Sequence, residues 1–466
     1  MFPRKYTTKR FCKSLGFALL SCLLFTCNKD DGSVDNGERP EDLETNGDLP
    51  FFRIDTKGNT IVDEPKVSAT LSVAQNRKSI FEGTIGIEFR GATSQGFEKK
   101  SFGIETWDTN DQDIDVPLLG FPEEEDWVLH GPYSDKSLIR NHLIYNLARD
   151  MGRYASRSEL VELQIDTTYR GVYVFMEKLK RDAGRIDISK LNPDENAGEA
   201  ITGGYILKID KLSGSGGGDG TYNATNSFES QLAPASAASD QTIRFLYEYP
   251  DAAVITAEQK AYIQEYVNDF EAALVSETFT DAVTGYANYI DVDSFIDFFI
   301  LNELANNVDG YRLSTYMHKD KNKKMVMGPI WDFNLAFGNA DYCSGGETNV
   351  WAYKFNERCS QDFWLVPIWW ERLLQDPAYV VKLKQRWASL RGTLLSNTAM
   401  ADRIASYVGR MRNAKAIENN FLTWNVLGIY VWPNNFVGST YAQENEYLMN
   451  WIEARVLWLD GAIEAL

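Results

Sequence analysis

The sequence predicts an α+β fold with two unequal lobes, the first rich in β-structure and the second mostly helical. Short alternating segments bounded by Gly, Asn and Asp occupy residues 51–105 and recur as far as residue 210. Beyond about Ala257, hydrophobic residues recur with helical spacing. The chain has 466 residues, of which 44% are hydrophobic and 13% aromatic, so it can bury a sizeable core in two or three domains or in one large two-lobed domain.

Residues 1–27 have the pattern of an export signal. Basic residues precede the 13-residue apolar run "SLGFALLSCLLFT", which is too short to span a bilayer comfortably. The run ends in "LLFTC", which resembles a bacterial lipobox with Cys27 as the lipidated first residue; "LLSC" at Cys22 is a weaker competitor. The following "NKDDGS" resembles the acidic export signal of Bacteroidetes surface lipoproteins. We therefore expect a lipid-anchored protein at the outer membrane or cell surface of a Gram-negative bacterium, with an ordinary cleaved signal peptide as the alternative.

The mature chain is strongly acidic. Residues 28–50 are polar and acidic and predict a flexible linker between the lipid and the folded domain. The whole chain has a formal net charge of −19, and because residues 1–27 carry five basic and no acidic residues, the remainder has a net charge of −24. Such a surface repels phosphate backbones, so we expect no nucleic-acid partner.

The first lobe is predicted from its strand-like segments. "FFRIDT", "KVSATLSVA", "TIGIEFRG" and "KKSFGIETW" alternate in hydropathy, and residues 158–179 predict a hairpin with its turn at "DTTYRG". "GGYILKID" continues the β pattern. Between these segments, residues 135–152 predict a helix that begins at Asp135 as N-cap and ends at Gly152 as C-cap.

The second lobe is predicted from its apolar stripes. Helices are expected in "EQKAYIQEYVNDFEAALVS", "DVDSFIDFFILNELANN", "FWLVPIWWERLLQD", "VVKLKQRWASLRGTLL" and the closing residues 441–466. Several of the twelve tryptophans fall within these stripes. Core packing therefore explains most of them better than an exposed sugar-binding platform.

The chemistry open to this chain is restricted. There are three histidines, His130, His142 and His318, and no HExxH, GxSxG or CxxC motif, which disfavours classical zinc proteases and α/β-hydrolases. We expect all three histidines to be structural. Phosphoryl transfer needs positioning, a metal and an acceptor for one proton, but no histidine, and Mg²⁺ prefers carboxylate oxygens and water.

Six segments, in order, resemble the CotH kinase-like family, named for the spore coat protein H of bacilli. They are "FRGATSQGFEKKSFGIE", "WVLHGPYSDKSLIRNHLIYNLARDMG", "YRGVYVFMEKL", "ILNELANNVDGYRLSTYMHKD", "MGPIWDFNLAFGN" and "WIEARVLWLD". The resemblance covers nearly the whole mature chain. It implies a two-lobed atypical protein-kinase-like fold, with the N-lobe over residues 51–180 and the C-lobe over residues 181–466, and ATP with Mg²⁺ or Mn²⁺ bound between the lobes.

The same resemblance implies roles for individual residues. Asp309 matches the catalytic aspartate that accepts the proton of a Ser or Thr hydroxyl, Asp332 in "WDF" matches the metal aspartate, and Lys100 matches the lysine that approaches the nucleotide phosphates. Further candidates, each also explained as a structural ion pair or satisfied polar group, are Arg90, Arg140 and Glu177 for the nucleotide and Asn306 before the catalytic loop.

Asp309 and Asp332 are separated by a predicted hairpin. "RLSTYMHKD" and "KKMVMGPIW" read as its strands and "KDKNKK" as its turn, which would bring both aspartates to one end. Two solvated turn aspartates are the alternative.

Two departures from the family pattern bear on activity. Protein kinases place a second metal-binding asparagine five residues after the catalytic aspartate, and here Ser314, a poorer Mg²⁺ ligand, takes that place. The glycine loop of the family usually reads "RGNSS", whereas here it reads "RGATS" at residues 90–94. The expected function is ATP- and metal-dependent phosphorylation of Ser or Thr in surface or secreted proteins; the alternative is an inactive pseudokinase that serves as a surface binding or adhesion lipoprotein, including a glycan-associated one.

The two cysteines of the folded body are Cys343 and Cys359, 16 residues apart. In an oxidising compartment they could form one disulfide. Two free buried thiols are the alternative.

Overall fold

The computed structural model describes residues 49–212, 220–238 and 241–466. The predicted signal peptide, Cys27 and the linker up to residue 48 lie outside these residues. None of the helices in the described part of the chain has both the length and the hydropathy needed to cross a bilayer.

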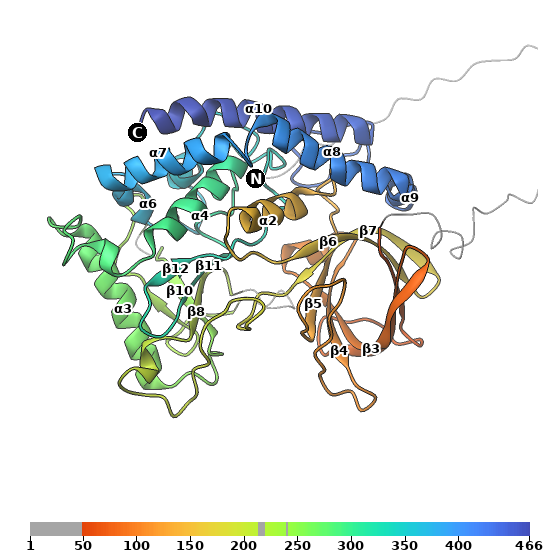
Figure 1. Cartoon of the computed structure of the whole chain (residues 1–466), viewed down its shortest axis with the longest axis horizontal. Coiled ribbons are helices and arrows are strands. Elements are labelled where there is room, and N and C mark those ends of the chain that lie inside the picture. Colours follow the sequence, from red (N-terminus) through yellow and green to blue (C-terminus); the bar gives the residue numbers. More distant parts are fainter. Residues whose placement is uncertain (1–48, 213–219, 239–240) are drawn as a thin grey trace, which may run out of the picture. The chain divides into compact units, whose positions relative to one another are not determined.

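In the described residues, seven strands close into a barrel in the N-terminal part (Figure 1). In spatial order they are β1 (Phe51–Asp55), β2 (Val67–Gln75), β3 (Lys78–Arg90), β4 (Ser101–Trp107), β5 (Asp126–His130), β7 (Thr168–Glu177) and β6 (Ser158–Ile165). The pairing of β6 with β7 confirms the predicted hairpin. Parallel pairing of β1 with β6, which sets Phe51 opposite Glu162, closes the barrel.

The strands β6 and β7 are buried on both faces. Tyr173 and Phe175 on β7 belong to the cluster that fills the barrel, whereas Val172 and Val174 belong to a second cluster outside it. Side chains alternate between the two faces of a strand, so each strand serves both cores. The barrel is thereby fixed to the rest of the chain through this outer face.

A second sheet, of five strands, is formed by segments that follow the barrel in the chain. Its strand order is β12 (Met325–Met327), β11 (Thr315–Lys319), β8 (Tyr205–Ile209), β10 (Arg244–Tyr249) and β9 (Ser227–Glu229). The antiparallel pairing of β11 with β12 confirms the predicted hairpin between Asp309 and Asp332. The antiparallel pairing of β11 with β8 sets Thr315 opposite Ile209.

The predicted helical character of the second lobe is also confirmed. Its main helices are α3 (Ala257–Val275), α4 (Val292–Ala305), α7 (Pro377–Arg391), α8 (Asn397–Asn413) and α10 (Tyr441–Glu464), with the shorter α5 (Phe355–Arg358), α6 (Trp369–Leu373) and α9 (Ala416–Thr423). The helix predicted over residues 363–376 is reduced to α6, because Pro367 disfavours helical backbone before it.

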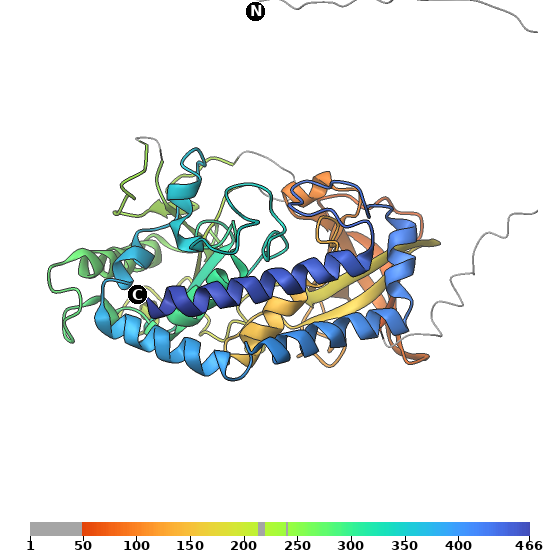
Figure 2. The ribbon, with the colours of Figure 1, turned by 90° about the horizontal axis from the view of Figure 1, so that it is seen from above.

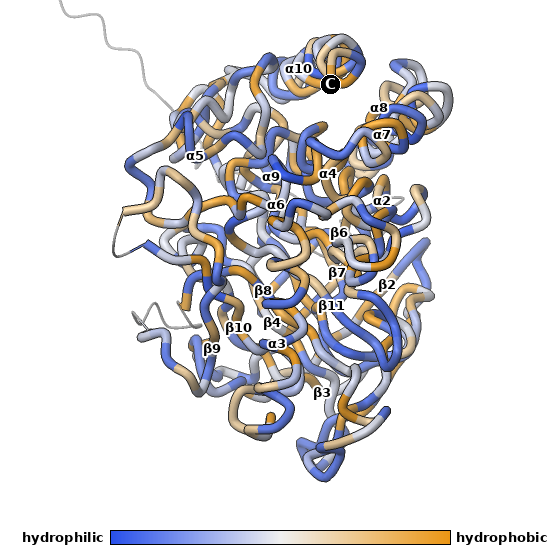
Figure 3. Tube along the Cα trace, turned by 90° about the vertical axis from the view of Figure 1, so that its left-hand side faces the viewer, coloured by the Kyte–Doolittle hydropathy of each residue, from blue (hydrophilic) through white to orange (hydrophobic). Residues whose placement is uncertain are grey.

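The long helices pack together over the sheets. Helix α10 contacts α4, α7 and α8, and Figures 1 and 2 show it running alongside α7 and α8. Along the tube in Figure 3, hydrophobic segments gather toward the interior and hydrophilic ones toward the periphery. Helix α4 is buried along nearly its whole length, so it forms the centre of this lobe.

Helix α2 (Arg140–Asp150) begins later than predicted. Leu138 has φ 68°, so residues 135–139 form a turn and Ile139 takes the N-cap position. The Asp135 carboxylate still accepts the backbone N–H of Arg140 at 2.9 Å. At the other end Gly152 has φ 90°, the left-handed conformation expected just beyond a helix.

The C-terminal helices contact the N-terminal barrel. Helix α9 packs on β7, and Asn420 Oδ1 accepts hydrogen bonds from Lys99 Nζ at 2.8 Å and from the Val172 N–H at 3.1 Å. Lys99 is buried, which lowers its pKa well below that of a free lysine, and its Nζ also donates to Val172 O at 2.6 Å. The barrel ends near residue 180, but residues far beyond that point complete its outer surface.

This contact predicts a stability effect for Asn420→Ala. The substitution leaves the Val172 N–H and part of the Lys99 ammonium without an acceptor in a buried place, so we expect a loss of about 2–3 kcal/mol in the free energy of unfolding. Urea denaturation at pH 7.5 measures it. The matched control is Asn450→Ala, an exposed position on α10, with an expected change within about 0.5 kcal/mol. Equal effects of the two substitutions would contradict the assignment.

Candidate functional site

Two cavities meet where the barrel faces the second sheet. One has a volume of about 410 Å³ and is lined by Asp309; the other has a volume of about 1040 Å³ and is lined by Lys66. We name them the Asp309 cavity and the Lys66 cavity, since each residue lines only one of the two. Both cavities are lined by Arg90, Gly91, Ala92, Asp210, Lys211, Ser314, Trp331 and Asp332.

Asp309 lies in the loop that follows α4, and this loop is tightly supported. Asn307 Oδ1 accepts the Asp309 N–H at 3.2 Å. One turn earlier, the buried Glu303 carboxylate accepts the N–H groups of Ala352 at 2.7 Å and Tyr353 at 2.8 Å. Arg455 of α10 forms an ion pair with the same carboxylate at 3.3 Å. The catalytic-loop candidate is therefore held by a helix close to the end of the chain.

Arg312 orients the Asp309 carboxylate. Its Nη2 lies 3.2 Å from Asp309 Oδ1 and its Nη1 lies 2.9 Å from Asp362 Oδ1. Its Nε donates to Val308 O at 2.9 Å, and the guanidinium stacks on the Phe355 ring at 3.9 Å. The Asp309 side chain is 23% exposed. Burial raises its pKa, and Arg312 and Lys211 oppose that rise.

Asp332 faces the same cavities from the other end of the hairpin. Its backbone has φ 54°, a left-handed conformation that is uncommon outside glycine and is often found at functional sites. Its N–H donates to the Tyr145 hydroxyl at 3.1 Å, and Ser314 Oγ donates to its Oδ2 at 3.3 Å. Burial raises the pKa of Asp332 to about 6; Arg90 opposes the rise, and Asp210 adds to it.

Asp210 is an acidic residue at both cavities that the sequence did not lead us to predict. It follows β8, and because Ile209 pairs with Thr315, Asp210 comes opposite Ser314 at the end of the sheet. Its carboxylate accepts the Lys211 N–H at 2.9 Å. Burial raises its pKa, and Lys208 opposes that rise. The sequence signal was present, since "GGYILKID" ends a buried strand with an acidic residue.

Arg90 and the first residues of the glycine loop line both cavities. Arg90 ends β3, and Gly91 has φ 98°, which turns the chain sharply after the strand. The Arg90 guanidinium lies 5.6 Å from the centre of the Trp331 ring. Lys211 Nζ reaches the same loop and donates to Thr93 Oγ1 at 3.2 Å.

Three predicted nucleotide contacts line neither cavity. Lys100 Nζ donates to Gln95 O at 2.5 Å, within its own loop. The buried Arg140 guanidinium pairs with Asp135 at 2.5 Å. Glu177 is buried at the end of β7, where Arg157 Nη1 contacts its carboxylate at 2.7 Å.

These three side chains have structural partners. The basic groups that line both cavities are instead Arg90 and Lys211, and Lys66 lines the larger one. The secondary candidate Asn306 is structural as well. It ends α4 with φ 40°, and its Nδ2 donates to Ser344 O at 2.9 Å.

The three histidines differ in position. His142 contacts Ser158 Oγ at 2.9 Å, and His318 contacts Gly328 O at 3.0 Å, both in the protein interior. His130 lines the Asp309 cavity. Burial lowers its pKa to about 4, so at neutral pH it is uncharged.

Cys343 and Cys359 form a disulfide, with their Cα atoms 5.2 Å apart. Tyr342, beside one cysteine, and Asp362, three residues after the other, both line the Asp309 cavity. The disulfide therefore holds together both ends of a segment that forms one side of that cavity.

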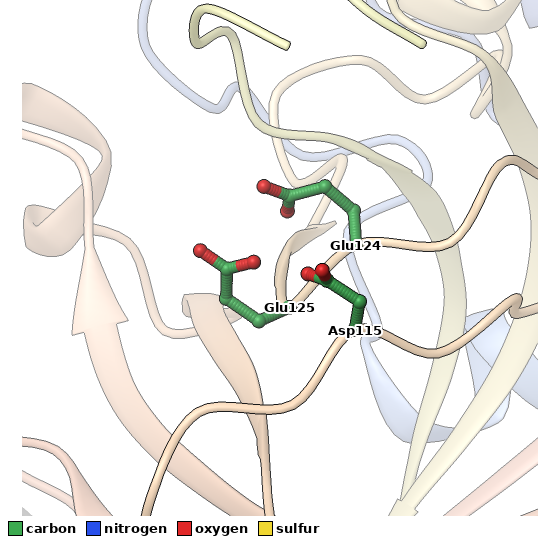
Figure 4. Close-up of side chains that lie close together, drawn as sticks. All are labelled: Asp115, Glu124 and Glu125. Carbon is green, nitrogen blue, oxygen red and sulfur yellow. The ribbon is translucent and has the colours of Figure 1, made fainter. Parts of the chain in front are cut away.

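A second acidic group lies outside these cavities. Asp115, Glu124 and Glu125 turn their carboxylates toward one another (Figure 4), with oxygens within 4.8 Å. Lys180 Nζ lies 2.6 Å from Glu124 and 2.5 Å from Glu125, and Arg185 contacts Glu124 at 2.9 Å. These two cations already supply the positive charge that a metal ion would bring, so we do not treat the group as a metal centre.

Comparisons with known proteins identify the family of the chain. The model of a family described as CotH kinase protein matches residues 87–459, which include Asp210, Asp309 and Asp332. The chain is also similar to the crystal structure of a Helicobacter pylori proinflammatory kinase, CtkA, with 10% identity and a TM-score of 0.29 over 78% of this chain and 94% of that one. No curated protein matches.

The raised pKa of Asp332 predicts a pH-dependent effect of Asp332→Asn. A carboxyl whose pKa rises from 3.8 to about 6 on folding favours the folded state while protonated, and this contribution is lost as the pH rises through 6. In a metal-free buffer we therefore expect Asn to raise the free energy of unfolding by about 1–2 kcal/mol at pH 7.5 and to have almost no effect at pH 4.

Urea denaturation at both pH values provides the measurement. Asp402→Asn, at an exposed position on α8, is the control and should show no such pH dependence. A gain at Asp332 that is the same at both pH values would rule out the electrostatic cause.

Proposed function

Because the chain belongs to the CotH kinase protein family, we propose that it is a protein kinase that uses ATP with Mg²⁺ or Mn²⁺ to phosphorylate Ser or Thr residues of surface or secreted proteins. One observation carries the proposal. Asp309 and Asp332, predicted as proton acceptor and metal ligand, line one cavity together with Arg90 and Ser314. Phosphoryl transfer requires this combination of a carboxylate base, a metal-binding carboxylate and a positive group for phosphate.

The donor set fits a hard divalent cation. Asp332, Asp210 and Ser314 would hold it, since all three offer oxygen atoms at the junction of the two cavities. Burial raises the pKa of both carboxyls, and repulsion from Asp210 and Asp309 adds to the rise at Asp332, which is the electrostatic situation that a cation relieves. When bound, the metal ion would neutralise charge on the transferring phosphate.

Asp210 compensates for the departure at Ser314. Protein kinases use a second ligand five residues after the catalytic aspartate, and a serine there is weak. The β8–β11 register sets Asp210 beside Ser314, so a carboxylate takes the place of the missing amide. This supports an active kinase over a pseudokinase.

Asp309 would accept the hydroxyl proton of the acceptor. Arg312 fixes one carboxylate oxygen at 3.2 Å and opposes the effect of burial on the Asp309 pKa, so it favours the ionised form that can take a proton. Arg90 and Lys211 would bind phosphate oxygens, and the planar guanidinium of Arg90 suits that task.

The N-terminal motif supports a place at the outer-membrane surface. Lipidation at Cys27 would attach the chain through acyl groups, and residues 28–50 would separate the kinase domain from the membrane. Substrates would then be proteins within reach of this tether.

Radiolabel transfer from ATP tests the kinase proposal. With Mg²⁺ or Mn²⁺, wild-type protein should label itself or a mixture of secreted proteins, and Asp309→Ala should reduce the rate by about 10²–10⁴-fold. Asp332→Ala and Asp210→Ala should also lower nucleotide-dependent metal affinity, measured by calorimetry. Lys100→Ala should stay within about threefold of wild type, since its side chain is engaged in its own loop.

The opposite results are equally informative. If wild type and Asp309→Ala transferred the radiolabel equally, the kinase proposal would be wrong. Nucleotide binding without transfer would leave the inactive binding protein as the function. If Lys100→Ala lost phosphate transfer while Arg90→Ala retained it, Lys100 would be the phosphate-binding residue.

Metabolic labelling with palmitate tests the anchor. Incorporation should disappear in Cys27→Ser and persist in Cys22→Ser, because only the acceptor cysteine of the lipobox is acylated. The reverse pattern would move the site to Cys22, and labelling that persists in a double variant would remove the lipoprotein assignment.

A further inference from the structure

The two cavities divide the reaction between two substrates. This step rests on the proposed kinase function. Both cavities open onto Asp210, Ser314 and Asp332, but Asp309 lines only the smaller one. The proton acceptor must touch the acceptor hydroxyl. In the proposed reaction the hydroxyl would therefore enter the Asp309 cavity, and the Lys66 cavity would remain for the rest of the nucleotide.

Several of the residues that line the Asp309 cavity are aromatic. Tyr342, Trp364 and Trp432 line it, and we call these three residues the aromatic lip. All twelve tryptophans lie in the part of the chain that the structure describes, and among them only Trp432 is classed as exposed, with 47% of its surface accessible. The exposed Phe363 packs edge-to-face on Trp364, 5.5 Å between ring centres, and extends the apolar surface outward.

The lip is held rigidly. Tyr342 and Trp432 stack almost parallel, with ring centres 6.1 Å apart. The backbone on either side is tied together, since the Asp341 N–H donates to Pro433 O at 2.8 Å and the Asn435 N–H donates to Asn339 O at 2.9 Å.

The disulfide fixes the other flank of Tyr342. An exposed tryptophan that is fixed beside a catalytic residue is best explained by a ligand that covers it.

We propose that the aromatic lip binds a large apolar or aromatic side chain next to the Ser or Thr that this protein phosphorylates. The acceptor is thus an extended protein segment with a bulky hydrophobic residue close to its hydroxyl. Binding such a side chain against Tyr342 and Trp432 would leave the neighbouring hydroxyl in the cavity that Asp309 lines.

The polar groups around the lip favour a peptide over a sugar. A sugar needs an open ring face together with hydrogen-bonding groups for its hydroxyls. Here the Tyr342 and Trp432 rings lie parallel to each other, with their centres 6.1 Å apart. The Asp341 carboxylate accepts the Tyr430 hydroxyl at 2.7 Å, and the Asp362 carboxylate is paired with Arg312 at 2.9 Å.

Peptide binding to the full-length Asp309→Asn protein in detergent tests the inference without turnover. The probes are nonapeptides with a central Ser whose neighbours are Phe, Leu, Gly or Glu, and tryptophan fluorescence reports binding. Phe- or Leu-flanked peptides should bind at least tenfold more tightly than Gly- or Glu-flanked ones. Trp432→Ala should remove that preference, whereas Leu457→Ala, at an exposed position on α10, should keep it.

The outcomes separate this inference from the kinase proposal. If no flanking preference is found, or if the preference survives Trp432→Ala, the proposed role of the aromatic lip in peptide binding is wrong. Binding of malto-oligosaccharides in place of peptides overturns it in favour of a sugar acceptor. Radiolabel transfer in the Asp309-containing protein is scored separately, so a lip that binds peptides in a protein without transfer activity would refute only the kinase.

Discussion

Three carboxylates line one poorly solvated cavity, and the repulsion that Asp210 and Asp309 exert on Asp332 is the constraint that the surrounding structure has to satisfy. Asp210, Asp309 and Asp332 reach it from the end of β8, the loop after α4 and the end of the β11–β12 hairpin. Like charges brought together in such a place raise one another's pKa and oppose folding. The positive groups nearby, Arg90, Arg312 and Lys211, offset part of that cost.

The local backbone is also unusual. Ser314 and Asp332 both have left-handed backbone conformations, with φ 46° and 54°. Such conformations cost free energy and persist where the surrounding structure fixes them. Here the sheet register, the Tyr145 hydroxyl and the supported α4 loop supply that restraint. Stability given up at this cavity is thus the condition for keeping the proposed cation-binding site open.

Local pattern in the sequence was sufficient for much of the fold and part of the site. The strands at residues 51–107, the β6–β7 and β11–β12 hairpins and the long helices follow from periodicity and turn residues. The meeting of Asp309 and Asp332 follows from one hairpin. The closure of the barrel and the place of Asp210 could not be predicted in this way, because both depend on pairing between strands far apart in the chain. Lys100, Arg140 and Glu177 have the residue types of a nucleotide site, but only tertiary structure shows that their side chains are engaged elsewhere.

The ion pair between Glu303 and Arg455 gives the site an order of assembly. During synthesis, which proceeds from the N-terminus, the residues of the barrel and of the β11–β12 hairpin are made before those of α10. Until Arg455 arrives, the buried Glu303 carboxylate lacks its cation, and the loop that carries Asp309 lacks its support. Helix α10 is thus required to complete the support of the Asp309 loop. A chain that lacks α10 would carry every proposed reacting residue but not the contacts that hold the Asp309 loop in place.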